Sequence, residues 1–412
     1  MKKIKYIDLF SGCGGLSEGL LKTDKFSEVA AVEWLKPQVN TLRNRLATKW
    51  DYLDSSERVL HFDLQREDEL FNGWDDDFYG RSKGLDYLVN KEGGIDIIVG
   101  GPPCQAYSIA GRVRDENGMK DDYRNYLFEH YLSVVKRYSP KIFVFENVPG
   151  MLSAKPGDKN VTDLVREGFN SIGYEIISDL KKYALINSKD FGVPQSRKRV
   201  IILGIKKDVV ENDNLELILE EFYTKILPKY SIEKEKTVFD AIGDLPKFNP
   251  VFDESLRKKK IAYVRDGIDK KNSLTWHSPR YHSIRDIEIF EMLAKDLEEG
   301  TNLYTDSKAI SKIYEDKVGS KSPIHRYHVL RPDRPSTTII AHLYKDGNRF
   351  IHYDSKQART LTPREAARLQ SFDDDFDFIG GQGATYQMIG NAVPPLLAEK
   401  LGYAVSDLLE IL

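Results

Sequence analysis

The hydrophobic residues of this chain follow one repeating pattern from residue 4 to about residue 206. Short β-branched runs alternate with amphipathic stretches, which is typical of a parallel sheet covered by helices on both faces. The predicted strands are residues 5–10, 28–33, 58–62, 95–99, 142–145, 174–180 and 200–204. The predicted helices include residues 16–22, 39–47, 124–138 and 163–171. We therefore expect an α/β fold with a mostly parallel, twisted sheet of the nucleotide-binding type.

The alternation is lost between about residues 208 and 328, where charged sequence dotted with aromatic residues predicts a second, more irregular domain. A regular helix is predicted again from Thr362 and Pro363, which suit its N-cap and its first position. A last amphipathic stretch, residues 395–409, predicts a closing helix. The expected organisation is a first domain over residues 1–207, a second over 208–328, and a segment over 329–412 whose final helix packs back on the first domain.

The length and composition fit a soluble globular protein with room for two domains. The chain has 412 residues, of which 41% are hydrophobic and 30% are charged. No apolar run is long enough to span a bilayer, and Lys5 and Asp8 interrupt the apolar stretch near the N-terminus. We therefore expect neither a signal peptide nor contact with a membrane.

The cysteines and the net charge bear on three possibilities: disulfide bonds, a metal site and nucleic-acid binding. The chain has two cysteines, Cys13 and Cys104, which excludes a disulfide framework and favours a reducing cytosol. Neither has the histidine and cysteine neighbours of a structural zinc site, so we expect no metal. The net charge of −3 gives no global sign of nucleic-acid binding. Basic residues do cluster within residues 181–199 and 257–271, and a solvated surface is the alternative interpretation of such clusters.

Cys104 lies in an unusual loop. Residues 100–105 read Gly-Gly-Pro-Pro-Cys-Gln and directly follow the predicted strand 95–99. Proline fixes φ and removes a backbone donor, so two prolines stiffen the loop. Cys104 is therefore either a small buried residue in a stiff turn or a nucleophile at the end of a strand. The six residues alone do not decide between these two interpretations.

Three other strand ends carry residues that suit a nucleoside. The glycines of residues 8–15 follow the first strand and allow a ligand close to the backbone, although the full G-x-G-x-x-G pattern is absent. Glu33 ends the second strand, where an acidic group receives ribose hydroxyls in such folds. Trp34 either stacks on an adenine or packs in the core. Asp63 follows the third strand, and together these residues predict a nucleoside pocket.

Residues after one further strand and before another extend the predicted site. Glu146 follows the apolar run 142–145, and burial there can raise the pKa of its carboxyl, as a proton donor at neutral pH requires. A helix cap or a salt bridge is the alternative role for Glu146. Arg197 and Arg199 precede the next strand and point to one side of the chain, where they can grip a phosphate or a base oxygen.

These motifs, in this order, resemble those of the DNA cytosine-5 methyltransferases of bacterial restriction–modification systems. The resemblance covers the chain except roughly residues 208–328. The matching residues are 10–15, Glu33-Trp34, Asp63, Pro102-Pro103-Cys104-Gln105, Glu146-Asn147-Val148, Gln195-x-Arg197-x-Arg199, Arg334-Pro335-Ser336-x-Thr338 and 387–395. Most of these motifs are weak singly, but their common order is highly specific.

The resemblance implies a reaction and a catalytic set. The thiolate of Cys104 would add to C6 of a cytosine while Glu146 protonates N3. C5 would then take the methyl group of S-adenosyl-L-methionine, leaving S-adenosyl-L-homocysteine. Arg197 would hold the cytosine O2 and help to orient Glu146, and Arg199 completes the set. The base must be flipped out of the duplex to be reached.

The resemblance also implies the binding partners. A Rossmann-like, S-adenosylmethionine-dependent methyltransferase domain would hold the cofactor, and residues 208–328 would form a smaller, irregular target-recognition domain. The cofactor contacts would be Phe10, Gly12, Gly14, Glu33, Trp34, Asp63, Pro103 and Asn391. Gln105, Arg280 and Arg285 would contact double-stranded DNA, and for the two arginines contacts to phosphates or carboxylates are the alternative.

The expected biological setting follows from the same resemblance. We expect a cytoplasmic, nucleoid-associated monomer that protects DNA from a cognate restriction endonuclease without forming a stable complex with it. A tRNA cytosine-5 methyltransferase is the main alternative, but that branch carries a further cysteine motif that this chain lacks. A non-catalytic DNA-binding protein predicts a damaged site, whereas Cys104, Glu146 and both arginines are present. An NAD-dependent oxidoreductase leaves the Pro-Pro-Cys loop unexplained.

Overall fold

The computed structural model describes residues 2–102, 127–155, 159–210, 214–266, 274–304, 306–319, 327–345 and 347–412. Pro103, Cys104 and Gln105 lie outside these residues. The chain divides into two compact units. Unit 1 consists of Met1–Gly192, Arg197–Glu233 and Ala392–Leu412, and unit 2 consists of Val193–Ser196 and Lys234–Asn391. The predicted functional boundaries after residues 207 and 328 stay predictions.

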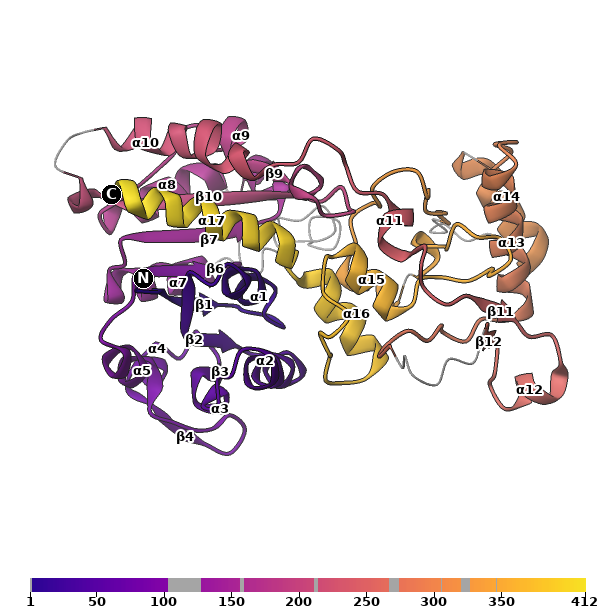
Figure 1. Cartoon of the computed structure of the whole chain (residues 1–412), viewed down its shortest axis with the longest axis horizontal. Coiled ribbons are helices and arrows are strands. Elements are labelled where there is room, and N and C mark those ends of the chain that lie inside the picture. The colour runs from indigo at the N-terminus through magenta and orange to yellow at the C-terminus, as the bar shows by residue number, and fades with distance from the viewer. Residues whose placement is uncertain are drawn as a thin grey trace. The chain divides into compact units, whose positions relative to one another are not determined.

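Unit 1 is built on one twisted, mostly parallel sheet, which confirms the predicted fold class. The strand order is β3, β2, β1, β6, β7, β10 and β8, with β9 paired to β10. Neighbours from β3 to β7 run parallel, whereas β10 is antiparallel to β7, β8 and β9 (Figure 1). The bounds are β1 Ile4–Leu9, β2 Phe26–Glu33, β3 Val59–His61, β6 Ile97–Gly100, β7 Ile142–Asn147, β8 Tyr174–Ile176, β9 Leu185–Asn187 and β10 Lys198–Lys206.

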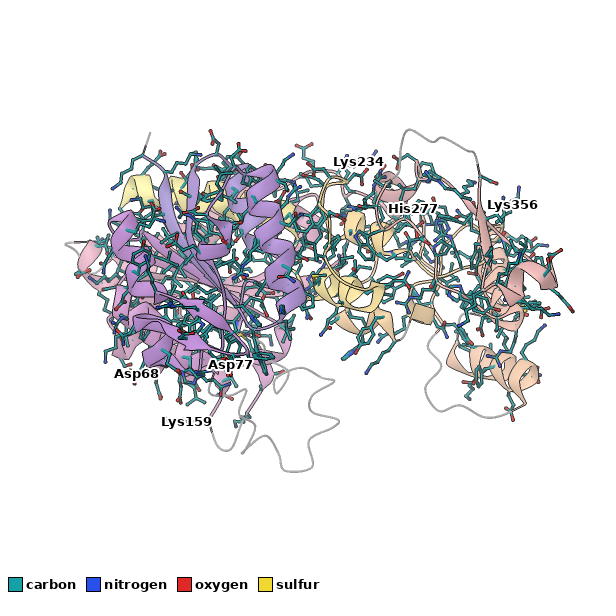
Figure 2. The ribbon with its side chains drawn as sticks, turned by 90° about the horizontal axis from the view of Figure 1, so that it is seen from below. Asp68, Asp77, Lys159, Lys234, His277 and Lys356 are labelled. Carbon is teal, nitrogen blue, oxygen red and sulfur yellow. The ribbon has the colours of Figure 1, made fainter. Side chains whose placement is uncertain are left out.

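Helices and one hairpin complete unit 1. The helices are α1 Gly15–Lys22, α2 Lys36–Lys49, α3 Ser55–Arg58, α4 Glu67–Asn72, α5 Gly84–Glu92, α7 Leu127–Tyr138, α8 Val161–Ser171, α9 Leu180–Tyr183, α10 Leu215–Glu221 and α17 Pro395–Ile411. The strands β4 Trp74–Asp76 and β5 Gly80–Ser82 pair antiparallel, and Asp77 lies in the turn between them (Figure 2). None of the helices that the structure describes is both long and apolar enough to cross a membrane.

The closing helix of the chain packs against the first helix of the sheet domain. α17 begins at Pro395, as the sequence predicts, and lies beside α1 (Figure 1). A Cβ atom on Gly15 would lie 2.3 Å from the carbonyl oxygen of Val393, and one on Gly19 would lie 2.3 Å from that of Pro395. No side chain fits at either position, so the two glycines allow the backbones to approach this closely.

One predicted strand is shorter than expected. β8 ends at Ile176 rather than at residue 180, and Leu180 instead begins the short helix α9. The side chain of Asp179 accepts a hydrogen bond from the N–H of Lys182 at 2.9 Å and so caps that helix. An Asp cap is a strong signal for a helix start, and here it outweighs the apolar run that suggests a longer strand.

Unit 2 is less regular but contains well-formed helices. Its elements are α11 Val238–Ile242, β11 Phe248–Pro250, α12 Glu254–Lys258, β12 Tyr263–Arg265, α13 Ile284–Glu298, α14 Ser307–Val318, α15 Pro363–Leu369 and α16 Gln382–Asn391. The predicted start of α15 is confirmed, because the Thr362 side chain accepts from the N–H of Glu365 and the Glu365 carboxylate accepts from the N–H of Thr362.

The expectation of an irregular second domain was too coarse for residues 284–298. This stretch forms the longest helix of unit 2 among the described residues, α13. Ser283 and Asp286 form a capping box at its start, and Ile287, Phe290 and Leu293 bury one face in an apolar cluster. The capping residues and the three- and four-residue apolar spacing were visible in the sequence and identify the helix.

Unit 2 also buries an ion pair beside neutral histidines. The Arg359 guanidinium donates to both carboxylate oxygens of Glu365, at 2.7 and 2.6 Å, and both side chains are fully buried. His282 lies within hydrogen-bond distance of the hydroxyls of Tyr263 and Thr360, at 2.9 and 3.1 Å. Burial lowers the pKa of His282 to about 4 and that of His352 to about 3. Both histidines are therefore neutral at pH 7.

We expect the folded chain to lose stability as the pH falls below about 6.5, because unfolded histidines then take up protons that the folded ones exclude. For His282 alone, the free energy of unfolding falls by about 2 kcal/mol between pH 7 and pH 5. Urea unfolding at these two pH values measures the change. The variant His282→Gln should show a pH dependence smaller by that amount, and an unchanged dependence would contradict the assignment.

Candidate active site

The loop after β1 follows the carboxyl end of that strand and contains two glycines, Gly12 and Gly14. Phe10, Gly12 and Gly14 have positive φ angles of 58°, 56° and 91°. The N–H of Ser11 donates to the carbonyl of Val32 at 3.1 Å, which ties the loop to β2, and α1 begins directly after it. β1 has β2 on one side and β6 on the other, so the loop lies where open α/β sheets bind their ligands.

Glu33 joins this loop to the end of β2. Its Oε2 accepts a hydrogen bond from the N–H of Gly12 at 2.9 Å, and its Oε1 accepts one from the N–H of Leu35 at 2.8 Å. Burial raises the pKa of the Glu33 carboxyl, although both bonds act in the opposite direction. Each oxygen keeps a second lone pair, so the oriented carboxylate can still accept from a ligand hydroxyl.

Trp34 and Asp63 extend the same edge. The Trp34 side chain is 49% exposed, which excludes the alternative that it packs in the core. Its carbonyl oxygen lies 3.0 Å from Nε2 of His61, and this contact ties the end of β2 to the end of β3. Asp63 follows β3 and is half-buried, with its Oδ1 accepting from the N–H of Gln65 at 3.0 Å.

The chemistry of these groups fits a nucleoside ligand. The hydroxyl of Ser11 is buried at this edge and has no hydrogen-bond partner among the residues that the structure describes. A buried hydroxyl without a partner, an oriented carboxylate and an open indole face are what a polar, aromatic ligand requires. Phe10, Gly12, Gly14, Glu33, Trp34 and Asp63 thus lie at the ends of three neighbouring strands of unit 1.

Asn391 is the last residue of α16 and belongs to unit 2. Its role as a cofactor contact stays a prediction. The residues that follow it, Ala392 and Val393, belong to unit 1 and lie against Gly15 at the start of α1.

Glu146 lies beside the start of the Pro-Pro-Cys loop. A Cβ atom on Gly101 would lie 2.6 Å from Oε2 of Glu146, so only glycine leaves room for the carboxylate in this position. The side-chain amide of Asn147 donates to the carbonyl of Pro102 at 3.5 Å. The chain that leads to Cys104 is therefore held against the end of β7. Pro103, Cys104 and Gln105 themselves lie outside the described residues.

Arg199 is the partner of Glu146. Its Nε lies 2.8 Å from Oε1 of Glu146, and the two side chains are only 12% and 13% exposed. Burial lowers the pKa of Arg199, while the Glu146 carboxylate raises it. Arg199 thus makes a direct ion pair with Glu146, while the charge of Glu146 also raises the pKa of Arg197, so the expectation that Arg197 helps to orient Glu146 stays a prediction. Glu146 thus has one anchored oxygen, Oε1, and a second oxygen, Oε2, that faces Gly101.

Arg197 directly precedes β10 and is fully buried. Its Nη2 donates to the carbonyl of Ala392 at 3.0 Å. Burial lowers its pKa well below the usual value, and the neighbouring charge of Arg199 adds to this effect. Because Ala392 precedes α17, Arg197 links the returning end of the chain to the sheet. Its predicted contact with the cytosine O2 stays a prediction.

The two arginines predicted to read DNA lie in unit 2. Arg280 donates to the carbonyls of Leu343 and Tyr344 at 2.5 and 2.8 Å, and its guanidinium lies 4.1 Å from the centre of the Tyr386 ring. Arg285 is more exposed and contacts Asp286 at 3.2 Å. These contacts leave base recognition by either arginine a prediction.

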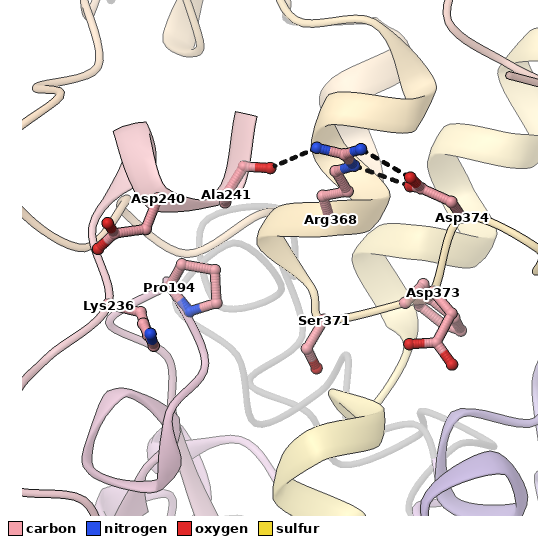
Figure 3. A pocket seen from close by; sticks show the side chains of 9 residues that line it. Pro194, Lys236, Asp240, Ala241, Arg368, Ser371, Asp373 and Asp374 are labelled. Atoms are coloured by element: carbon pink, nitrogen blue, oxygen red, sulfur yellow. Dashed lines mark hydrogen bonds and ion pairs between the residues drawn. The ribbon is translucent and has the colours of Figure 1, made fainter. Parts of the chain in front are cut away.

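Unit 2 also contains a cavity of about 380 Å³ that the sequence did not predict (Figure 3). Arg368 donates to both carboxylate oxygens of Asp374, at 2.8 and 2.6 Å, and to the carbonyl of Ala241 at 3.1 Å. The arginine is thus satisfied within the cavity wall. The lining residues are Pro194, Lys236, Asp240, Ala241, Arg368, Ser371, Phe372, Asp373 and Asp374, and the predicted site residues are not among them.

Comparison with known proteins identifies a family and several relatives. The family model for C-5 cytosine-specific DNA methylase matches residues 4–407. The chain is 34% identical to the type II methyltransferase M.Bpa9945I of Bacillus paralicheniformis, over 98% of each chain. It is 32% identical to the type II methyltransferase M1.HphI of Haemophilus parahaemolyticus, over 98% of this chain and 86% of the relative.

A likeness among solved structures supports the fold. A crystal structure of a provisionally named DNA modification methyltransferase, encoded within an E. coli prophage, matches with a TM-score of 0.60. The two sequences are 24% identical, and the match covers 99% of this chain and 100% of the other.

We expect the substitution Gly101→Ala to displace the Glu146 carboxylate, because the added methyl group cannot share its space. Crowding of this kind lowers the free energy of unfolding by about 1–3 kcal/mol, which urea unfolding measures. Gly381→Ala is a matched control, since a Cβ atom there meets no atom within 4 Å and the same substitution should change stability by less than about 0.5 kcal/mol. Equal stability of the two variants would show that the tight contact at Gly101 is absent.

Proposed function

The chain belongs to the C-5 cytosine-specific DNA methylase family and is a type II DNA (cytosine-5-)-methyltransferase, and from this membership we propose the roles of its site residues. One observation carries the proposal. Glu146 is held by Arg199 with its free oxygen toward Gly101, three residues before Cys104. This arrangement supplies an oriented acid beside the loop that carries a nucleophile.

The covalent step falls to Cys104. Its thiolate adds to C6 of the target cytosine, which divides a difficult substitution on an unactivated ring into easier steps. Addition at C6 makes C5 nucleophilic, and C5 takes the methyl group. Water then takes the C5 proton, the sulfur leaves C6 as thiolate and N3 returns its proton to Glu146, which restores the aromatic ring. Gly101 and Pro102 shape the chain that leads to the nucleophile, and we propose Pro103 as a wall between the target base and the methyl donor.

Glu146 acts at N3 of the cytosine. Oε1 is occupied by Arg199, so Oε2 is the atom that faces the base and carries the proton to N3 as C6 is attacked. Protonation there prevents negative charge from building up on the ring. Arg199 positions Glu146, and we assign Arg197 to the cytosine O2, where its charge stabilises the developing enolate-like oxygen.

Members of the family use S-adenosyl-L-methionine, which supplies an activated methyl group when bound and leaves as S-adenosyl-L-homocysteine. We propose that Glu33 receives the ribose hydroxyls, that the exposed face of Trp34 stacks on the adenine and that Asp63 accepts from its amino group. We propose that the loop at Phe10, Gly12 and Gly14 contacts the rest of the cofactor. Asn391 and Pro103 are the remaining proposed contacts. No metal ion takes part in this scheme.

The substrate is double-stranded DNA. The target base must leave the stack, at a cost of a few kcal/mol, before its C5 and C6 atoms reach the site. We propose that residues 208–328 recognise the sequence, with Arg280, Arg285 and Gln105 among the DNA contacts. The relatives are type II methyltransferases, so we propose a functional pairing with a restriction endonuclease. We also propose that the protein is a monomer and that it lies at the nucleoid in the cytoplasm.

We expect Cys104→Ala to abolish methyl transfer, because alanine has no thiolate to form the bond to C6. Bisulfite sequencing of DNA from cells that express the parent or the variant measures the methylated positions and their context. Cys13→Ala is the control, since it removes the other thiol, which is buried and not assigned to the chemistry. Methylation by Cys104→Ala would remove this cysteine from the mechanism.

We expect Glu146→Gln to lower kcat by about 10²- to 10⁴-fold, the usual contribution of a general acid. The amide keeps the shape of the side chain but has no proton to give to N3 and cannot form an ion pair with Arg199. Binding of S-adenosylhomocysteine, measured by titration calorimetry, should stay within about twofold of the parent, because Glu146 is not among the proposed cofactor contacts. A large loss of cofactor affinity with kcat retained would make Glu146 structural.

A further inference from the structure

The connection between β11 and β12 carries four basic residues in a row. Residues 257–260 read Arg-Lys-Lys-Lys and form the end of α12 and the turn that follows it. The side chains of Lys258, Lys259 and Lys260, which we call the α12 lysines, are exposed. Figure 1 shows α12 at the edge of unit 2. Such a run is often only a solvated surface, so the contacts of its members decide its role.

The α12 lysines have no acidic partner among the residues that the structure describes. Other lysines of unit 2 do have one. Lys247 lies 2.8 Å from Asp354, and Lys317 lies 2.8 Å from Glu288. Within the described part of the chain, the charges of the α12 lysines are therefore left available to a partner outside the chain.

Arg257 has a different role from the lysines, because it holds α12 in place. Its guanidinium donates to the carbonyls of Val251 and His282 at 2.9 and 2.6 Å. It also donates to the hydroxyl of Tyr281 at 3.2 Å and lies 5.0 Å from the centre of that ring. The side chain of Asp253 caps the other end of the helix. The short helix that carries the lysines is thus fixed at both ends.

Lys260 has a backbone conformation that lysine rarely adopts. Its φ angle is 60°, in the left-handed region. Its N–H donates to the carbonyl of Arg257 at 2.8 Å, and the N–H of Ile261 donates to that of Leu256 at 3.0 Å, so Lys260 ends the helix. Glycine or asparagine is usual at such a position. A lysine costs stability there, and costs of this kind are typical of residues that serve a function.

Apolar side chains are exposed on both sides of the basic run. Phe252 precedes α12 and is 53% exposed, and Ile261 follows the run and is 38% exposed. Val264 on β12 is 50% exposed. Exposed apolar groups beside unpaired charges are typical of a surface that contacts another macromolecule.

We propose that the α12 lysines contact the phosphates of double-stranded DNA, with Arg257 as the positioning residue that holds their helix. The inference rests on the proposed function, because it takes double-stranded DNA as the substrate. Three ammonium groups complement the negative charge of the DNA backbone, and contacts to phosphates strengthen binding without reading the bases. A local surface of this kind allows a chain with a net charge of −3 to bind DNA.

The test measures DNA binding by the full-length chain as the salt concentration changes. The probes are a labelled duplex with the sequence context that bisulfite sequencing identifies and a second duplex that lacks it. Each lysine on a phosphate contributes about 0.9 to the slope of log K against log[salt]. We expect the triple variant Lys258→Gln, Lys259→Gln, Lys260→Gln to have a slope smaller by about 2.7. Between about 50 and 200 mM salt, the parent should therefore lose about 40-fold more affinity than the variant.

The two duplexes distinguish contacts to phosphates from contacts to bases. Loss of phosphate contacts weakens binding of both duplexes to the same extent. An unchanged slope, or a loss of affinity confined to the duplex with the recognised sequence, would overturn the proposal.

A second triple variant controls for net charge. Lys308→Gln, Lys312→Gln, Lys317→Gln removes the same number of positive charges from α14, where Glu315 and Asp316 lie on the same helix. We expect this variant to keep the slope of the parent. An equal fall of the slope in both triple variants would show an effect of net charge alone and would also overturn the proposal.

Lys260→Asn separates DNA binding from folding. Asparagine tolerates the left-handed conformation better than lysine and removes the charge. We expect the midpoint of urea unfolding to equal or exceed that of the parent, while the slope of DNA binding falls by about 0.9. A lower midpoint with an unchanged slope would make Lys260 a structural residue and contradict its place on the DNA.

The parent protein tests the proposed function in the same experiments. If the parent methylates the duplex and the variant of the α12 lysines keeps the full slope, the proposed function stands and this surface has no part in it. If the parent does not methylate double-stranded DNA, the proposed function itself fails. Methylation by the parent together with the smaller slope of the variant supports both.

Discussion

The parallel pairing of β2, β1, β6 and β7 is the constraint on which the rest of unit 1 depends. Because these strands run in one direction, their carboxyl ends meet at one edge and bring together loops that are far apart in the sequence. The glycine loop follows β1, Glu33 ends β2, Gly101 follows β6 and Glu146 lies near the end of β7. The antiparallel strand β10 then enters from the same edge, so Arg199 at its start reaches Glu146.

The polar contacts at this edge orient groups more than they stabilise the fold. A nearly buried ion pair such as that of Glu146 and Arg199 contributes little net stability, because both charges lose water, but it fixes the position of a carboxylate. Glu33 is fixed in the same way by two backbone N–H groups. Such fixed orientation matters in a DNA cytosine-5 methyltransferase, because the acid must reach N3 and the methyl donor must reach C5 of the same small ring. Preorganised groups need no rearrangement when charge develops.

Much of this arrangement could be predicted from the sequence, and what could not has a physical reason. Strands β6 and β7 begin as continuous apolar runs, so the residues that follow these runs mark the sheet edge without ambiguity. Arg197 and Arg199 lie two residues apart with the same side-chain type, and only the antiparallel pairing of β10 with β7 decides which one meets Glu146. The β4–β5 hairpin was missed because its strands are three residues long and rich in Asp and Gly, with no alternation to detect. The sequence alone does not decide whether Trp34 packs in the core or faces a ligand, because the exposure of a side chain depends on what packs around it.

The most direct test of the central claim is a crystal structure of the protein with S-adenosylhomocysteine and a duplex that contains 5-fluorocytosine at the target position. The fluorine blocks loss of the C5 substituent, so a covalent adduct formed during turnover persists. We expect a bond between the sulfur of Cys104 and C6 of the flipped base, with Oε2 of Glu146 at N3, Arg199 on Oε1 and the adenosyl group at Glu33 and Trp34. A base bound away from Glu146, or a cofactor bound away from Glu33 and Trp34, would contradict it.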